Sequence, residues 1–315
     1  MARQDEIIKE RLKKIKELKN LGINPYPHSY EKKHSLAELQ KEYNSLKPEQ
    51  KAKSSVKTAG RLLIIRDIGK ITFGVLQDDS GKIQIVLQDT ETSNKIIEFF
   101  KKYIDAGDFI GVEGPVFRTK RGELSILVKK LELLSKSILP LPDKWHGLED
   151  KEERYRKRYL DLIMSSEVKE VFNKREKIVD AIREFLKSRD FHEVDTPYLQ
   201  AIYGGAAAKP FKTHLNALNM ELFLAISSEL YLKRLIVGGY EKVFTIARNF
   251  RNEGIDRWHN PEFTMMEIYQ AYTDYEDMMD LFEDIYIYVA KKVNGTTKIK
   301  FRGKDIDLKK PWKRM

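Results

Sequence analysis

The hydrophobic pattern of the first 55 residues predicts two helices and a linker. Between residues 4 and 20, apolar side chains recur at the spacing of one helical stripe, and basic side chains fill the other faces. A shorter helix is expected at 35–44, and the segment 47–55 has the composition of a linker. The basic faces are either solvated or in contact with an RNA backbone. The stripe contains Ile7, Ile8, Leu12, Ile15 and Leu18, and the basic faces carry Lys9, Arg11, Lys13, Lys14, Lys16 and Lys19.

From residue 56 the pattern changes to short apolar runs that are typical of β-strands. The sequence Asp-Asp-Ser-Gly at 78–81 is a hairpin turn between two of them. A helix at 92–104 separates three strands from two more, which is the order expected of an OB-fold, a five-stranded barrel that binds oligonucleotides. Other small barrels share this order. The predicted strands cover 56–66, 70–77, 82–88, 108–118 and 123–134.

A proline-punctuated segment at 139–147 is the best candidate for a domain boundary. Beyond it the pattern predicts helices alternating with strands, so the fold class is α+β with more than one domain. The predicted domains are a helical extension and linker (1–55), a barrel (56–138), a linker (139–150) and a second domain (151–315). Helices are expected at 149–163, 166–189 and 274–291, and a hairpin within the last residues, 297–315.

The segment 241–272 reads as two long strands joined by a loop. In the first strand small side chains alternate with bulky apolar ones and end at Arg251. An antiparallel pairing would bring Arg251, Phe263 and Glu267 together, with His259 in the loop, as a floor for a nucleotide. The alternative is an ordinary hairpin with a surface ion pair between Arg251 and Glu253, which would contribute little to stability.

Composition narrows the functional classes. The chain has 58 Lys+Arg against 48 Asp+Glu, a net charge of +10, which favours a polyanionic partner such as nucleic acid. It contains no cysteine, which excludes disulfides and thiolate metal sites. We find no signal sequence or membrane-length apolar run and expect a cytoplasmic protein. Neither a Rossmann glycine motif nor a P-loop is present.

The sequence FRNEGIDRWHNPEF at 250–263 resembles the second signature motif of class II aminoacyl-tRNA synthetases. The segment 182–199, which contains Pro197, resembles the first motif, the usual dimer interface of that class. The segments 204–218 and 227–254 closely resemble lysyl-tRNA synthetases, and 60–88 and 140–162 fit the same family. The resemblance therefore extends over nearly the whole chain and implies an OB-fold followed by part of a class II catalytic domain.

The resemblance implies ATP, lysine and tRNA(Lys) as substrates and a homodimer formed through 182–199. Arg251 would hold the α-phosphate of ATP in two hydrogen bonds, as suits a planar guanidinium, and would be the catalytic residue. The lysine ammonium group would need carboxylates, because an unpaired buried cation is costly. The implied ATP-binding residues are Arg251, Glu253, His259, Asn260 and Phe263; the lysine-binding residues are Gly205, Glu229, Glu267 and Tyr269; and the anticodon-binding residues are Arg66, Phe73, Gln84 and Glu123.

Two of these residues also have a simpler interpretation from the sequence alone. Glu229 begins a helical segment, where a carboxylate is favoured by the helix dipole. Phe73 is of a type that more often belongs to the core of its strand. The family resemblance favours the substrate role for Glu229 and a base-stacking role for Phe73.

The match departs from the family in several places. The third class II motif and the acidic residues that bind Mg²⁺ beside ATP are absent, so we expect no metal ligand in this chain, expect the Mg²⁺ ligands beyond residue 315, and interpret the sequence as truncated. Lys209 stands where arginine is common, Ser228 where proline is common and Leu215 where histidine is usual. The leading hypothesis is a lysine–tRNA ligase. The alternatives are a non-catalytic tRNA-binding or regulatory fragment and, less favoured, a synthetase for aspartate or asparagine.

Overall fold

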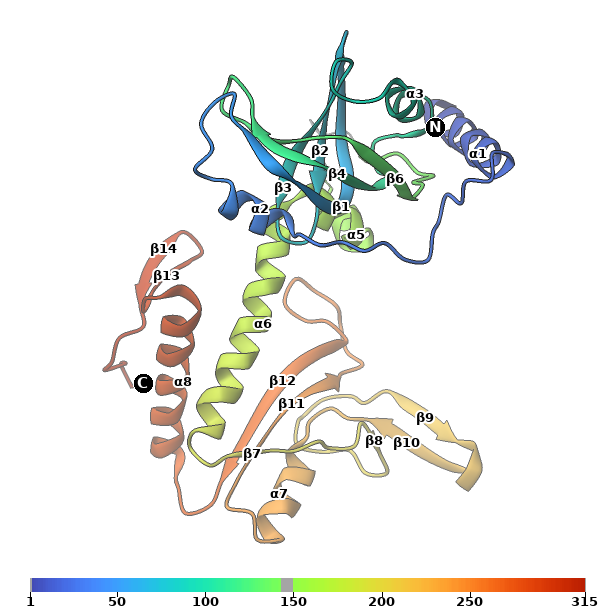
Figure 1. Cartoon of the computed structure of the whole chain (residues 1–315). Coiled ribbons are helices and arrows are strands. Elements are labelled where there is room, and N and C mark those ends of the chain that lie inside the picture. Colours follow the sequence, from blue (N-terminus) through green and yellow to red (C-terminus); the bar gives the residue numbers. More distant parts are fainter. Residues whose placement is uncertain (1, 143–149, 315) are drawn as a thin grey trace. The chain divides into compact units, whose positions relative to one another are not determined.

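The computed structural model describes residues 2–142 and 150–314, and their side chains from residue 4 onward. The chain divides into two compact units, Met1–Met164 and Ser165–Met315, which are described separately (Figure 1). Of the predicted linker at 139–150, residues 143–149 lie outside the described residues. None of the described helices is long and apolar enough to span a membrane.

The first unit is built on a six-stranded sheet. Strand β1 pairs with both β2 and β4, so the pairings run β1–β2–β3–β5–β4 and return to β1, and β6 pairs with β4. The turn at 78–81 joins β2 and β3 as predicted, because the Asp78 carboxylate accepts the Ser80 and Gly81 N–H groups. The strands are β1 (Lys51–Ile68), β2 (Ile71–Gln77), β3 (Lys82–Gln88), β4 (Phe109–Arg118), β5 (Leu124–Leu127) and β6 (Lys130–Ser135).

Two expectations about this sheet were wrong. The segment 123–134 is two strands, not one, because the Val128 and Lys129 N–H groups turn to the carbonyls of Val86 and Glu113 on different strands. The segment 47–55 is not entirely a linker, since β1 begins at Lys51 and its first residues pair with β4.

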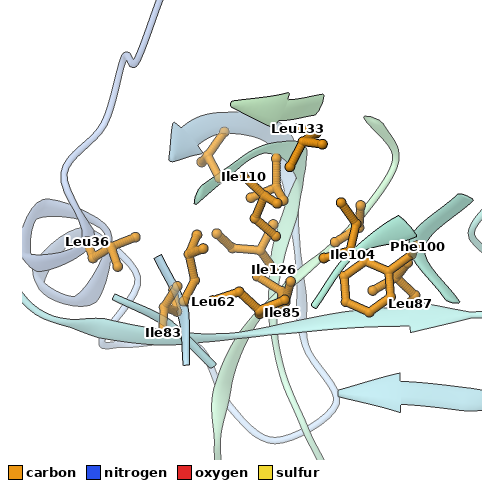
Figure 2. Close-up of a cluster of buried hydrophobic side chains, with 14 of the residues drawn as sticks. Leu36, Leu62, Ile83, Ile85, Leu87, Phe100, Ile104, Ile110, Ile126 and Leu133 are labelled. Atoms are coloured by element: carbon orange, nitrogen blue, oxygen red, sulfur yellow. The ribbon is translucent and has the colours of Figure 1, made fainter. Parts of the chain in front are cut away.

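Helices close the ends of this sheet around one core (Figure 2). Leu62, Ile85, Ile110 and Ile126 are fully buried between the strands. Helix α1 adds Leu18, α2 adds Leu36 and Leu39, and α3 adds Ile97, Phe100 and Tyr103 to the same cluster. The helices are α1 (Ala2–Asn20), α2 (Leu36–Glu42), α3 (Asn94–Tyr103), α4 (Lys151–Arg156) and α5 (Arg158–Met164), so the helix expected at 149–163 is interrupted at Lys157.

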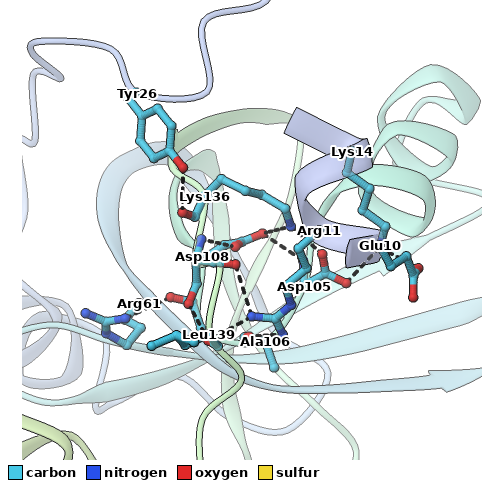
Figure 3. Close-up of polar contacts among 12 residues, drawn as sticks. Glu10, Arg11, Lys14, Tyr26, Arg61, Asp105, Ala106, Asp108, Lys136 and Leu139 are labelled. Carbon is cyan, nitrogen blue, oxygen red and sulfur yellow. Dashed lines mark hydrogen bonds and ion pairs between the residues drawn. The ribbon is translucent and has the colours of Figure 1, made fainter. Parts of the chain in front are cut away.

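Helix α1 is attached by buried charges (Figure 3). The Arg11 guanidinium, only 7% exposed, donates to the carbonyls of Ala106, Ser137 and Leu139. Leu12 is 47% exposed. The predicted apolar stripe is therefore wrong at these two positions: the arginine faces inward because three backbone carbonyls accept its hydrogen bonds there, and the leucine faces outward.

The second unit contains two three-stranded sheets, ordered β12–β11–β7 and β8–β10–β9, and a two-stranded hairpin. The predicted strand pair within 241–272, the helices predicted at 166–189 and 274–291 and the C-terminal hairpin are all confirmed. The elements are α6 (Ser166–Lys187), β7 (His192–Glu193), β8 (Leu199–Gln200), β9 (Lys212–Leu215), β10 (Met220–Leu224), α7 (Glu229–Val237), β11 (Lys242–Phe250), β12 (Glu262–Gln270), α8 (Tyr275–Asn294), β13 (Lys298–Phe301) and β14 (Lys304–Asp307).

Helices α6 and α8 pack on one face of the β11–β12 pair. Phe244 and Ile246 of β11 contact a cluster that includes Phe185 and Leu186 of α6 and Ile285 of α8. Only the last turns of α6, from Ile182 onward, join this core. Val171, Phe172 and Ile178, nearer the start of the helix, are 65%, 46% and 38% exposed.

Candidate functional site

The β11–β12 pair forms the floor of the site. Its register places Asn249 opposite Phe263 and Thr245 opposite Glu267, all on the face away from the α6–α8 core. The Arg251 guanidinium lies 5.1 Å from the centre of the Phe263 ring. The predicted cation and aromatic ring are therefore together at one end of this face, whereas Glu267, four residues along β12 from Phe263, lies towards the other end, so the expected grouping of all three residues was wrong.

The loop between the strands presents two further predicted residues. The Arg251 N–H donates to the Pro261 carbonyl at 2.9 Å and closes the base of the loop. At its tip, the Trp258 and His259 N–H groups and the His259 ring contact the Asp256 carboxylate, which lowers the pKa of that group. His259 and Asn260 are exposed there, free of the protein core.

The alternative ion pair between Arg251 and Glu253 does not form among the described residues. Glu253 Oε1 instead accepts the Lys209 N–H at 3.3 Å, and the Asn252 N–H donates to the Lys209 carbonyl at 2.7 Å. The segment before β9 is thereby attached to the start of the loop, so Glu253 faces that segment.

At the other end of the floor, two carboxylates and a tyrosine come together. Glu267 accepts hydrogen bonds from Ser227 Oγ at 2.8 Å and from the Ser228 N–H at 2.9 Å. Burial raises the pKa of Tyr269, and the charges of Glu267 and Glu229 raise it further. Tyr269 therefore remains a neutral hydrogen-bonding group beside two acidic side chains.

Glu229 lies where its simpler interpretation predicts, at the start of a helix. It occupies the first turn of α7, where the helix dipole favours a carboxylate, and it pairs with Lys233 one turn later at 2.6 Å. It also lies against Gly205. A Cβ atom at Gly205 would meet Glu229 Cβ at 2.6 Å and Ser227 Oγ at 2.7 Å, and the backbone φ there is +87°. Only glycine fits this position without strain.

Sequence reasoning assigned no role to Ser227 or Asn249. Ser227 positions Glu267, and Asn249 is fully buried on the site face. Among the described residues, five buried side-chain nitrogen or oxygen atoms have no hydrogen-bond partner, and three of them are Asn249 Nδ2, Asn249 Oδ1 and Arg251 Nε. A signal was available: Asn249 is an amide among the small residues of a strand face.

A separate groove lies on the sheet of the first unit, with a volume of about 850 Å³. The four residues predicted to bind the anticodon all line it, together with the cations Arg118, Lys120 and Arg121. Arg66 lies opposite Phe73 in the β1–β2 register, and Gln84 Nε2 donates to Ser125 Oγ at 2.8 Å. Phe73 is half-buried on the groove face, whereas Thr72, Gly74 and Leu76 face the core, so the expectation of a core phenylalanine was wrong.

Comparisons with known proteins match both regions of the chain in which these residues lie. Residues 150–315 match the model of tRNA synthetases class II (D, K and N), and residues 56–134 match that of the OB-fold nucleic acid binding domain. The chain belongs to the class II tRNA synthetases. The predicted resemblance and fold class are thereby confirmed.

This class II synthetase is similar to curated lysine–tRNA ligases. It is 48% identical to that of Methanoculleus marisnigri over 97% of the chain and 60% of the relative, and 51% identical to that of Carboxydothermus hydrogenoformans over 99% and 62%. The ligase of Thermotoga maritima is 49% identical over 98% of the chain and 62% of the relative. The chain thus spans about 60% of the length of these relatives.

No group of three or more His, Cys, Asp or Glu side chains that could hold a metal ion is found in the described part of this class II synthetase.

Proposed function

We propose that this chain carries the lysine-activating site of a lysine–tRNA ligase. One observation supports it above the others. A single sheet face carries an aromatic ring beside Arg251 at one end and Glu267 and Tyr269 at the other, where Glu229 of α7 lies near Tyr269 and against Gly205. The first set suits a nucleotide and the second suits an amino acid with a cationic side chain.

In the proposed reaction, a carboxylate oxygen of lysine attacks the α-phosphorus of ATP and pyrophosphate leaves. Arg251 would hold the α-phosphate and neutralise the developing negative charge, and Phe263 would stack on adenine. Glu253, His259 and Asn260 would line the ATP site. The activated carbonyl is then attacked by a hydroxyl of the terminal ribose of tRNA, and AMP leaves. Catalysis of this kind depends mainly on positioning and charge stabilisation.

Specificity for lysine follows from the charge at the substrate end. Glu229 and Glu267 would compensate the ammonium groups of the substrate, and Tyr269 and Gly205 would shape the pocket. A synthetase for aspartate would need cations at the same positions, because an acidic substrate would be repelled. Among the matched class II specificities, the carboxylates therefore favour lysine.

The groove of the first unit is the proposed anticodon site. Phe73 would stack on an unpaired base, and Arg66, Gln84 and Glu123 would contact base edges and backbone, which is the usual chemistry of single-stranded RNA recognition. On this proposal residues 1–55 are an N-terminal extension, 56–138 the anticodon-binding domain, 139–150 a linker and 151–315 the catalytic portion.

The remaining parts of the proposal follow from the family. We infer a homodimer formed through 182–199, which is consistent with the exposed Tyr198 and Leu199. Mg²⁺ would accompany ATP and neutralise its phosphates. tRNA charging would place the protein in the cytoplasm.

The test is exchange of labelled pyrophosphate into ATP by the 315-residue chain, with each amino acid supplied in turn. Exchange with lysine alone is expected. Glu267→Gln should strongly reduce it at low lysine concentration, and the matched control Glu262→Gln, on the opposite face of the same strand, should leave it unchanged. If folded protein exchanges with no amino acid, the chain is a non-catalytic fragment that binds tRNA, which is the second candidate function.

A further inference from the structure

We propose that Asn249 is a positioning residue that orients Arg251 for the phosphate of ATP. The inference rests on the proposed function. It starts from the three unpartnered polar atoms on β11 and its continuation, Asn249 Nδ2, Asn249 Oδ1 and Arg251 Nε. The other two such atoms among the described residues are Gln77 Oε1 and Glu283 Oε1, and the latter lies 3.0 Å from Arg314 Nη2 in an ion pair. Unpartnered groups therefore concentrate at the site.

The two residues are complementary in chemistry and in place. They are two positions apart on one strand, so their side chains leave the same face, with Cα atoms roughly 7 Å apart. Asn249 Oδ1 is an acceptor without a donor, and the Arg251 Nε–H is a donor without an acceptor. Phe263 lies directly across from Asn249 and beside the Arg251 guanidinium, so all three share one neighbourhood.

A purely structural role does not explain this carboxamide. Buried polar groups in proteins are nearly always paired, because an unpaired one is destabilising. The contrast is visible within the same site, where Glu267 receives two hydrogen bonds from Ser227 and Ser228. A leucine at position 249 has the same number of side-chain heavy atoms and no polar atom, so it would remove the unmet hydrogen bonds and leave the free protein at least as stable.

The role becomes clear when Arg251 engages a phosphate. The guanidinium then turns from the Phe263 ring, where the structure places it, towards the ligand. A hydrogen bond from Nε–H to Asn249 Oδ1 would fix the plane of the guanidinium and leave both Nη groups free for a bidentate contact with phosphate. Asn249 itself would touch neither ATP nor lysine.

The test is a double-mutant cycle with Asn249→Leu and Arg251→Lys in the full chain, because lysine has no Nε–H donor. The dissociation constant of Mg-ATP and the urea stability of the free protein are measured for each variant. We expect Asn249→Leu to weaken ATP binding on the order of tenfold or more and to leave the stability of the free protein unchanged or higher. In the Arg251→Lys background it should weaken ATP binding no further.

Additive losses or an unchanged ATP affinity would each overturn the proposal. If leucine is too bulky and the variant does not fold, Asn249→Ala takes its place in the cycle. Failure of the unsubstituted chain to bind Mg-ATP would overturn the proposed function, and this role with it. ATP binding that is insensitive to Asn249 would overturn this role alone.

Discussion

Two deeply buried polar residues, Lys136 in the first unit and Asn249 in the second, differ in whether their hydrogen bonds are made. In the first unit, Lys136 is fully enclosed, and its ammonium group contacts Asp105 and Asp108, at 2.7 Å for the second. The Asp108 carboxylate also accepts the N–H groups of Asp105 and Ser137 (Figure 3). In the second unit, Asn249 is as deeply buried and has no hydrogen-bond partner among the described residues.

Buried polar groups with all their hydrogen bonds made stabilise the fold, whereas a buried polar group without a partner is available to a functional interaction. A buried ion pair that is fully hydrogen-bonded fixes the segments that carry it, here the start of β4 and the chain that follows β6. A buried amide without a partner stores unused hydrogen-bonding capacity, which is typical of functional sites. Substitutions in the first cluster should therefore change stability, and substitutions in the second should change function.

The largest effect is expected from Lys136→Met, which breaks the closed cluster. It leaves two carboxylates without their shared cation in a buried setting, and we expect a loss of about 3–5 kcal/mol in the free energy of unfolding. Urea denaturation measures it. The control Lys102→Met breaks the exposed pair with Glu17, 3.5 Å apart, and should change the free energy of unfolding far less. Equal losses in the two variants would contradict the special role of the closed cluster.

Glu267→Gln should show the reverse pattern. Glutamine keeps one oxygen to accept from Ser227 or Ser228, so stability should change by less than about 1 kcal/mol. Binding of lysine should weaken by roughly 2 kcal/mol or more, about thirtyfold, because the charge opposite its ammonium group is lost. Separate titrations with lysine and with ATP measure this; similar losses for both ligands would argue against a lysine-specific role.

The groove of the first unit extends the comparison, because substitutions on its open face should change ligand binding more than stability. Phe73→Ala removes a stacking surface and should weaken tRNA affinity by about 1–3 kcal/mol while ATP–pyrophosphate exchange is unchanged. Filter binding and exchange assays measure the two quantities. Phe109→Ala, at a phenylalanine that lies outside the groove and contacts Arg61, is the matched control. Unchanged tRNA affinity in Phe73→Ala would refute the anticodon assignment.

The smallest effect concerns pH and the hairpin turn. Burial raises the pKa of Asp78, but hydrogen bonds from Lys32, the Leu36 N–H and Ser80 outweigh it and lower the pKa from 3.8 to about 2. A carboxyl group whose pKa is lower in the folded protein than in the unfolded chain stabilises the fold when the pH is above the unfolded-state pKa. That stabilisation is lost as the pH falls through the folded-state pKa. Asp78→Asn should thus cost about 1 kcal/mol at pH 7, after allowance for solvent screening, and much less near pH 2. An undiminished difference at pH 2 would show that charge is not the cause.

Much of the fold could be predicted because local patterns are strong where only one face of an element is buried. The alternation in β11 and β12 defined both strands, and the loop sequence between them defined the family. The strand break after Leu127 had no local signal, since Val128 and Lys129 pair with different strands only once the sheet has closed. The buried Arg11 was missed for the same reason: its three carbonyl partners are distant in the sequence.

The sequence by itself therefore determined the elements, the family and the residue types available at each site. Only the tertiary structure decided which polar groups are paired. It showed that Phe73 faces a groove, that Ser227 and Ser228 hold Glu267, and that Asn249 lies beside Arg251 with its hydrogen bonds unmet. The physical reason is that hydrophobic periodicity is a property of neighbouring residues, whereas the satisfaction of a buried donor or acceptor depends on atoms that folding brings from elsewhere in the chain.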